Sequence, residues 1–232
     1  MALAASRAAT TSRAARTETA RGDGSATAGP APTLQSLKSA QTRARLIEAT
    51  IRCIVKFGYA STTTPQVAAE AGLSRGAMLH HFENGEALIK AAIVELHDKR
   101  LRAFRRAADT ENHDPGTLVR TYWRQISKPT FIAFHELALA SRTNAGLARI
   151  LQPLQVEFRE RFNAQAATLF PEWQGDQDRF RFAMTLSQTM MEGMAVSLLT
   201  GGMDESMVEP MLVSLEAQIK QMMPGVRADQ AS

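Results

Sequence analysis

The chain has 232 residues, of which 44% are hydrophobic, and a formal net charge of +4. No uninterrupted apolar run of about 18 residues occurs, which excludes a conventional transmembrane helix. The single cysteine, Cys53, excludes an intrachain disulfide and fits a reducing cytoplasm. Residues 1–41 carry five Lys or Arg against two Asp or Glu, whereas residues 101–232 carry fourteen against fifteen. A basic N-terminal part of this kind is compatible with a polyanionic partner.

The first residues of the chain have an unusual amino-acid composition. Residues 1–33 are rich in Ala, Thr, Ser, Gly and Arg and contain almost no large apolar side chain, so they cannot bury enough surface to offset the entropy of ordering. We therefore predict a disordered tail over residues 1–40, and a second one over 224–232. Two alternatives stay open for the first tail: an arm that follows DNA, or a targeting peptide, since acidic residues are few before Glu18.

From about Gln41 onward, apolar residues recur at three- and four-residue spacing, the pattern of an amphipathic helix, and Gly58 is suited to end the first helix. Similar stripes predict helices over 86–109, 116–127, 130–142, 145–170, 176–199 and 204–222. Pro153 is expected to kink or split the helix that contains it. No alternating strand pattern accompanies them, so the predicted fold class is all-α.

The segment TTTPQVAAEAGLSRGAMLHHF, residues 62–82, carries the most information. Thr63 and Gln66 form a capping box for a short helix, which Gly72 ends in a conformation that is cheap only for glycine. Ser74 then caps a second helix that runs to about His81 with Met78 as its buried anchor. Two short helices joined by a tight turn predict a helix-turn-helix, whose second helix can enter a major groove. The alternative is an ordinary helix hairpin in an α-bundle.

The run from Thr42 to Ile93 resembles the N-terminal DNA-binding domain of the TetR family of bacterial transcriptional regulators. The matching features are Gly58-Tyr59, Thr62-Thr63, Val67-Ala68, Ala71-Gly72, Leu73-Ser74, Gly76, His81-Phe82, Glu86 and Leu88. The resemblance implies a helix-turn-helix DNA-binding domain over 41–90, followed by a helical effector-binding and dimerisation domain over 91–223. It also implies a homodimer on a palindromic double-stranded DNA operator.

The helix caps and the resemblance together predict a set of DNA-contacting residues: Thr62, Thr63, Ser74, Arg75, Gly76, Ala77, Leu79 and His80. The family often has a tyrosine where this chain has Leu79 and a lysine where it has Gly85, and both usually contact phosphate. These departures are expected to weaken binding and lower its salt dependence.

His80 is expected to point toward DNA, while His81-Phe82 closes the second helix against the first. A metal site is not expected there, because adjacent helical residues project roughly 100° apart and no nearby Cys or acid completes a site. His135-Glu136 lacks the second histidine of a zinc-protease helix, since position 139 is Leu. No nucleophile elbow or phosphate-binding glycine loop occurs either, so we expect no enzyme, no metal and no cofactor.

Large apolar residues of the C-terminal half are candidates for an effector pocket: Trp123, Phe131, Phe134, His135, Phe158, Phe162, Met184, Met190, Met191 and Met194. Such a lining suits a lipophilic or aromatic molecule. For each residue the alternative is core packing, and His135 could either orient a ligand or be a core histidine.

These observations predict a cytoplasmic, homodimeric, ligand-responsive transcriptional regulator, typically a repressor, with no membrane partner. Two alternatives remain. One is a non-specific DNA-associating protein without an effector, and the other is a helical small-molecule-binding protein with a vestigial helix-turn-helix.

Overall fold

The computed structural model describes residues 33–108 and 114–224, and every regular element in these ranges is helical, as the sequence predicted. The elements are α1 Leu34–Phe57, α2 Thr64–Glu70, α3 Arg75–His81, α4 Gly85–Ala108, α5 Pro115–Ile126, α6 Pro129–Ser141, α7 Ala145–Leu169, η1 Pro171–Trp173, α8 Gln177–Leu199, η2 Glu205–Met207 and α9 Val208–Met222. Most of the tails predicted to be disordered, 1–32 and 225–232, lies outside the described residues.

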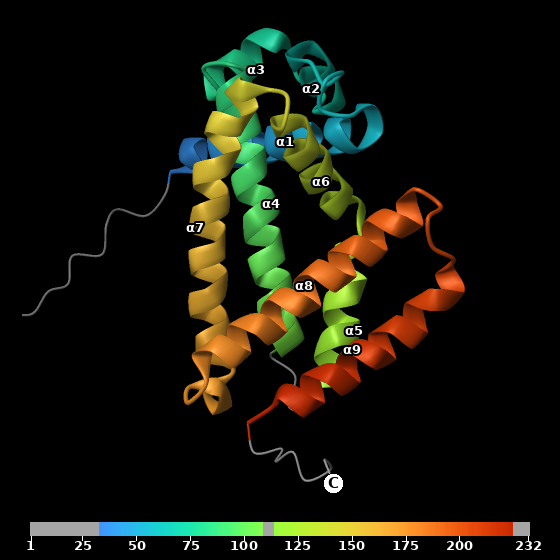
Figure 1. Ribbon diagram of the computed structural model, residues 1–232. Helices are drawn as coiled ribbons and strands as arrows, with labels where there is room; N and C mark the ends of the chain where they lie inside the picture. The colour runs from blue at the N-terminus through green and yellow to red at the C-terminus, as the bar shows by residue number, and fades with distance from the viewer. Residues whose placement is uncertain (1–32, 109–113, 225–232) are drawn as a thin grey trace, which may run out of the picture.

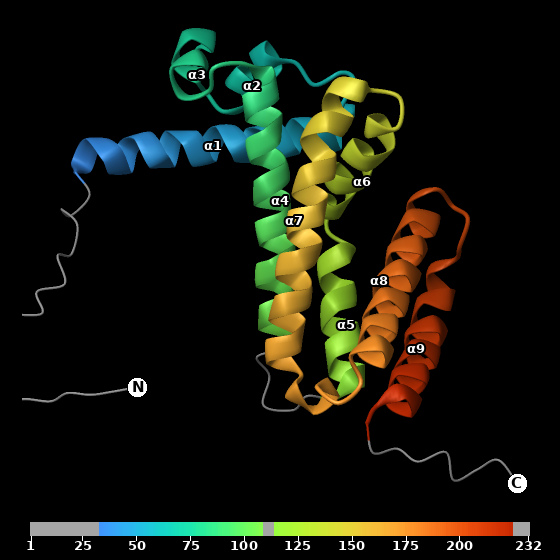
Figure 2. The same cartoon turned by 60° about the vertical axis from the view of Figure 1, so that its left-hand side comes forward.

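The first helix begins at Leu34, seven residues before the predicted start, so the segment 34–40 is helical and the prediction that the tail extends to residue 40 is wrong. The Thr33 side chain starts the helix by accepting a hydrogen bond from the backbone N–H of Ser36 at 3.1 Å. Its first turns project beyond the rest of the molecule, and Leu34 is 79% exposed (Figure 2). A local cap therefore starts α1 before its apolar stripe begins, which periodicity alone could not detect.

Helices α1, α2 and α3 form one end of the molecule and share a core that is closed by the start of α4 (Figure 1). The fully buried side chains of this core include Leu46, Cys53, Val67, Met78 and Phe82. Burial raises the pKa of the Cys53 thiol, which agrees with its predicted role as a small core residue.

The long helix α4 connects this end of the molecule to the remaining helices. It runs without interruption from Gly85 to Ala108 and packs against α1, α5 and α7. Buried residues of α1, α4, α6 and α7 also share one apolar cluster, which includes Ile54, Leu96, Leu137 and Leu147. The predicted domain boundary at residue 90 therefore falls inside a continuous helix. The helix-turn-helix and the distal helices are joined by this helix and by the shared apolar cluster.

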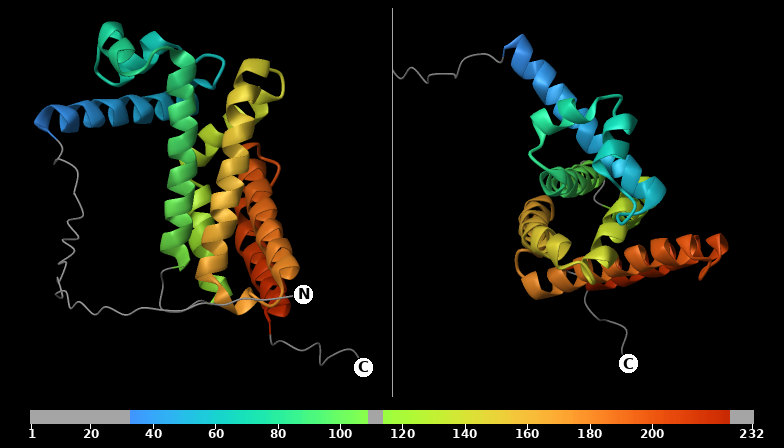
Figure 3. Two further views of the ribbon diagram at one scale, coloured as in Figure 1. Left: turned by 90° about the vertical axis from the view of Figure 1, so that its left-hand side faces the viewer. Right: turned by 90° about the horizontal axis from the view of Figure 1, so that it is seen from above.

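The helix α7 contains Pro153 and is not split by it. Proline removes one helical hydrogen bond, but Leu151 and Phe158 on either side are buried against neighbouring helices and hold the segment in place. Helices α8 and α9 form a hairpin on the outside of the molecule, packed on α5 (Figures 1 and 3).

Candidate nucleic-acid interface and effector cavity

The helix α3 is anchored from one side and exposed on the other. Met78 is fully buried beneath it, and the Ser74 hydroxyl oxygen accepts a hydrogen bond from the backbone N–H of Ala77 at 3.1 Å. The predicted DNA-contacting residues Ser74, Arg75, Gly76, Leu79 and His80 are exposed, and Ala77 is half-buried. The N-terminal half of α3 thus presents polar and small residues to solvent, the arrangement that a recognition helix requires.

The turn before α3 has the geometry that the sequence predicted. Gly72 has a φ of +63°, and the backbone N–H of Leu73 donates to the Ala68 carbonyl at 2.9 Å. The Arg45 guanidinium on α1 donates to the Ala71 carbonyl at 2.7 Å. The angle between α2 and α3 is therefore fixed by glycine and by a contact from a third helix.

The end of α3 is also fixed to α1, in agreement with the predicted role of His81-Phe82. Arg43 donates through Nη1 to the His81 carbonyl at 2.8 Å, and its guanidinium lies 4.0 Å from the centre of the buried Phe82 ring. A cation over an aromatic face is attractive, so α1 fixes the orientation of α3. His80, the other member of the pair, remains exposed.

The two threonines before α2 have different environments. The Thr63 backbone N–H donates to Oε1 of Gln66 at 2.9 Å within the predicted capping box, and the side chain is exposed. The Thr62 hydroxyl donates to the Gly58 carbonyl at 2.8 Å and is half-buried. Thr63 is therefore the more accessible of the two predicted contacts.

The electrostatics of this surface favour a polyanion. Glu70 on α2 is paired with Arg52 at 2.7 Å and with Lys56 at 3.0 Å, and hydrogen bonds from these two cations lower the pKa of its carboxyl. Arg75 forms no ion pair within the described ranges. Its charge is available to a phosphate or to a base edge.

A separate cavity of about 90 Å³ lies in the distal part of the molecule, among α4, α5, α7, η1, α8 and α9. Its walls are mostly aromatic and apolar and are formed by Phe104, Pro115, Leu118, Val119, Tyr122, Phe162, Phe170, Glu172, Trp173, Phe180, Ala183, Met184, Ser187, Gln188, Met191, Ile219 and Met223. Three residues predicted for an effector pocket, Phe162, Met184 and Met191, are among them.

The other residues predicted for an effector pocket do not line this cavity. Phe134 and Phe158 turn toward the Arg100 guanidinium, which lies 4.8 and 4.7 Å from their ring centres. Phe131 packs against the ring of His135, with 4.1 Å between centroids. Trp123 lies against the apolar cluster formed by α5, α6, α8 and α9. Met190 and Met194 belong to that cluster too.

Several cavity residues were missed by the sequence reasoning. Trp173 lies in the short connection η1, and Phe180 lies at the start of α8, where a helical stripe gives no sign of a cavity. Tyr122 precedes Trp123 in a predicted helix. The only sign in the sequence that it could line a cavity is that its polar hydroxyl lies on a buried helix face.

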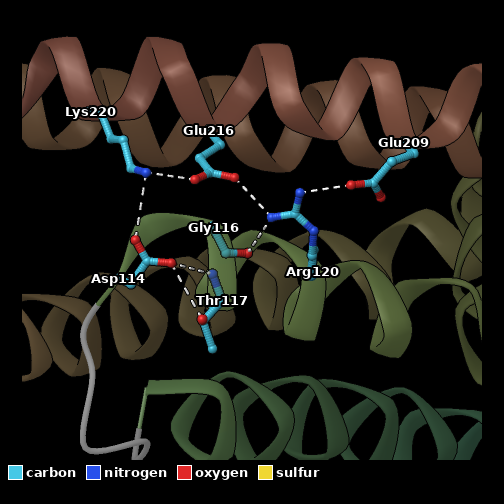
Figure 4. A network of polar contacts seen from close by, with 7 residues as sticks. All are labelled: Asp114, Gly116, Thr117, Arg120, Glu209, Glu216 and Lys220. Atoms are coloured by element: carbon cyan, nitrogen blue, oxygen red, sulfur yellow. Dashed lines mark hydrogen bonds and ion pairs between the residues drawn. The ribbon is translucent and has the colours of Figure 1, made fainter.

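A polar network holds α9 against α5 at the edge of this cavity (Figure 4). Arg120 donates to Glu216 at 2.8 Å and to Glu209 at 2.7 Å, and Lys220 donates to Glu216 at 2.6 Å. A Cβ on Gly116 would lie 2.5 Å from the Glu216 carboxyl group, so glycine permits this close approach. The pairs are partly exposed and individually weak, but together they fix the position of one cavity wall.

A buried polar cluster lies between α4, α5, α6 and α8. Arg100 on α4 forms an ion pair with Glu192 on α8, and both are largely shielded from solvent. Burial is the main cause that raises the pKa of Tyr122 and lowers the pKa of His135. Burial and the positive charge of Arg100 also lower the pKa of nearby His97 to about 4. Both histidines are therefore neutral near pH 7.

No group of three or more His, Cys, Asp or Glu side chains in 33–108 and 114–224 is arranged to hold a metal ion. No helix in these ranges combines the length and the apolar character needed to cross a membrane.

Comparison with known proteins identifies the exposed helix pair. Residues 46–92 match the family described as bacterial regulatory proteins, tetR family. Over 103 residues the chain is 35% identical to the HTH-type transcriptional regulator TtgR of Pseudomonas putida, a match that spans 44% of this chain and 46% of TtgR. The chain thus spans about half the length of that relative.

Other similarities extend further along the chain. An uncharacterised HTH-type transcriptional regulator of Mycobacterium bovis, Mb2936c, is 27% identical over 170 residues, which cover 70% of this chain and 85% of that protein. The solved structure of Salmonella enterica GusR is similar with a TM-score of 0.59 and 20% identity, covering 79% of this chain and 95% of GusR. At this identity the likeness establishes the fold.

Proposed function

The chain belongs to the TetR family of bacterial transcriptional regulators, and on that premise we propose that it is a ligand-responsive repressor that binds a palindromic operator as a cytoplasmic homodimer. The observation that carries this proposal is the recognition helix α3, which is buried through Met78 and tied to α1 through Arg43 while Arg75 and His80 remain exposed. A helix that is rigidly held but open on its polar face is suited to a groove.

In the proposed complex, two copies of α3 occupy successive major grooves. Arg75 contacts a base edge or a phosphate, and His80 contributes to sequence preference. Thr63 and the N-terminus of α3 add contacts to the DNA backbone. Leu79 and Gly85 offer no side-chain donor to phosphate, so the expected salt dependence of binding is modest, because each phosphate contact adds to its slope.

The outward face of α8 and α9 is the proposed dimer interface. Phe182 is 61% exposed on α8 and Val213 is 49% exposed on α9. Gly193, three helical turns beyond Phe182 on the same face, has open space where a Cβ would stand. Two such helix pairs can form a four-helix bundle, which is a common self-complementary interface.

The effector is proposed to act from the distal cavity. Helices α8 and α9 contribute both to the cavity wall and to the proposed dimer face, so a ligand that shifts them changes the spacing of the two recognition helices. A second coupling between the distal helices and the helix-turn-helix is proposed through α6. There, Oε1 of Glu136 accepts a hydrogen bond from the backbone N–H of Tyr59, just after α1, at 3.1 Å. Coupling of this type is typically worth about 1–3 kcal/mol.

The test is selection of bound duplexes from a random or genomic pool by the purified full-length protein, followed by titration of the selected site and a scrambled site at one salt concentration. We expect a palindromic site that is preferred by roughly a thousandfold or more. Arg75→Ala should weaken operator binding, and His80→Ala should change sequence preference. The matched control is Arg159→Ala, because Arg159 is an exposed arginine on α7.

The outcomes separate the alternatives. Equal affinity for selected and scrambled duplexes would indicate a non-specific DNA-associating protein. Ligand binding without any duplex enrichment would indicate a helical small-molecule-binding protein, a possibility favoured only by the substitutions at Leu79 and Gly85. If neither α3 variant altered binding to a verified operator, the assignment of α3 as the recognition helix would be wrong.

A further inference from the structure

The walls of the distal cavity limit the chemistry of what it can hold. Aromatic side chains contributed by α4, α7 and α8 line it, and Met184, Met191 and Met223 form flexible parts of the wall. The volume of about 90 Å³ is small, below the roughly 150 Å³ of an engineered cavity that takes benzene. With adjustment of the methionines, the apolar body of a ligand is restricted to about one ring.

Two polar side chains on this apolar wall lack an acceptor. The Tyr122 hydroxyl and the Gln188 side-chain amide nitrogen are buried, and neither donates a hydrogen bond to a described residue. Tyr122 as a whole is only 7% exposed. Leaving such a group unsatisfied costs about 1–3 kcal/mol, and native structures seldom do so without a reason. The Tyr122 hydroxyl oxygen can accept from the neighbouring Arg100 guanidinium, which leaves the hydroxyl hydrogen without an acceptor, as the Gln188 N–H also is. Both groups therefore call for an acceptor atom on the ligand.

The charges nearby exclude a negatively charged ligand. Arg100, the cation whose charge acts on Tyr122, is already paired with Glu192. Glu172 is itself part of the cavity wall and would repel an anion. A carboxylate buried here would find no unpaired cation among the described residues of the wall to offset its desolvation. A neutral carbonyl oxygen can accept from a hydroxyl and an amide without this cost.

We propose that the effector of this regulator is a neutral single-ring aromatic compound with a carbonyl oxygen, which accepts hydrogen bonds from Tyr122 and Gln188 while its ring packs among Phe104, Phe162 and Trp173. The inference rests on the proposed function only in calling this ligand the effector. The cavity, the donors without an acceptor and the surrounding charges are properties of the chain alone.

The test uses three probes of nearly equal shape and the full-length protein: acetophenone, its hydrocarbon isostere 2-phenylpropene, and benzoate. Binding is measured by calorimetry. Acetophenone should bind at least tenfold more tightly than 2-phenylpropene, since each of the two hydrogen bonds is worth about 1 kcal/mol and a factor of ten corresponds to about 1.4 kcal/mol. Benzoate should bind more weakly than acetophenone.

Tyr122→Phe and Gln188→Met should each reduce the preference for the ketone over the hydrocarbon, and the double variant should abolish it while leaving hydrocarbon binding intact. Tyr59→Phe is the matched control, because Tyr59 is the only other tyrosine and lies outside the cavity. It should keep the preference.

Three results would overturn the proposal: no binding of either neutral probe, tighter binding of benzoate, or a ketone preference that is unchanged in Tyr122→Phe and in Gln188→Met. Duplex selection by the same preparation separates the two proposals. If the protein binds the ketone but selects no operator, the proposed regulatory function is refuted and the proposed ligand chemistry stands. If it selects an operator but does not bind the ketone, the ligand chemistry is refuted and the regulatory function stands.

Discussion

The proposed dimer face allows a quantitative prediction for Phe182→Ala. Phe182 is 61% exposed in the single chain. A phenylalanine buries about 150–250 Å² when fully enclosed, so about 100–150 Å² per copy would be removed from water by the partner. At about 25 cal/mol per Å², that area is worth about 3 kcal/mol, of which truncation to alanine forfeits about 2 kcal/mol.

A two-fold dimer contains two copies of Phe182, so the dimer loses about 4 kcal/mol, and its dissociation constant should rise by roughly a thousandfold. Gly193→Arg should have an equal or larger effect, because a side chain fits at this position in the single chain but would meet the partner in the dimer. Sedimentation velocity over a range of protein concentrations measures both variants.

The control is Val156→Ala, since Val156 is 45% exposed on α7, outside the α8–α9 pair. Circular dichroism should show that all variants keep their helical content. The reasoning would be refuted if Phe182→Ala and Gly193→Arg sedimented as the unaltered protein does at every concentration. It would also fail if Val156→Ala dissociated the dimer equally well.

Three further predictions concern the DNA interface, the buried histidine and the contact between α6 and α1. Leu79→Tyr combined with Gly85→Lys should raise operator affinity and steepen its logarithmic salt slope by about 0.9 per added phosphate contact. The Thr64 methyl group, 3.3 Å from a Cβ at position 85, need move only slightly to admit the lysine. Titrations at several salt concentrations measure this slope. The pKa of His97 is lowered from 6.5 to about 4, so between these pH values the unfolded chain binds a proton at His97 that the folded chain does not. This contribution to the free energy of unfolding should be fully present above pH 6.5 and fall by up to about 1.4 kcal/mol per pH unit toward pH 4. Urea unfolding against pH should show a smaller decline in His97→Gln. Glu136→Ala removes the acceptor of the Tyr59 backbone N–H, so the effector should still bind but should release the operator less effectively. Glu136→Gln keeps an acceptor oxygen and should retain the response. Identical behaviour of the two variants would exclude coupling through the contact between α6 and α1.

The sequence by itself determined the helices and the helix-turn-helix. The capping box at Thr63, the positive φ of Gly72 and the Ser74 cap all depend on atoms only a few residues apart, so they are readable from local order. The burial of Met78 follows from helical periodicity in the same way. The early start of α1 is the exception, since the cap at Thr33 precedes any apolar stripe.

Only the tertiary structure decided which apolar residues line the cavity. Phe158 and Phe162 are one helical turn apart on α7, yet Phe158 meets Arg100 while Phe162 meets the cavity. Tyr122 and Gln188 come from distant segments and face a common space through the packing of α5 against α8. Periodicity identifies the buried face of each helix, but it carries no information on where neighbouring helices fail to fill the space between them, because that depends on how separate elements pack.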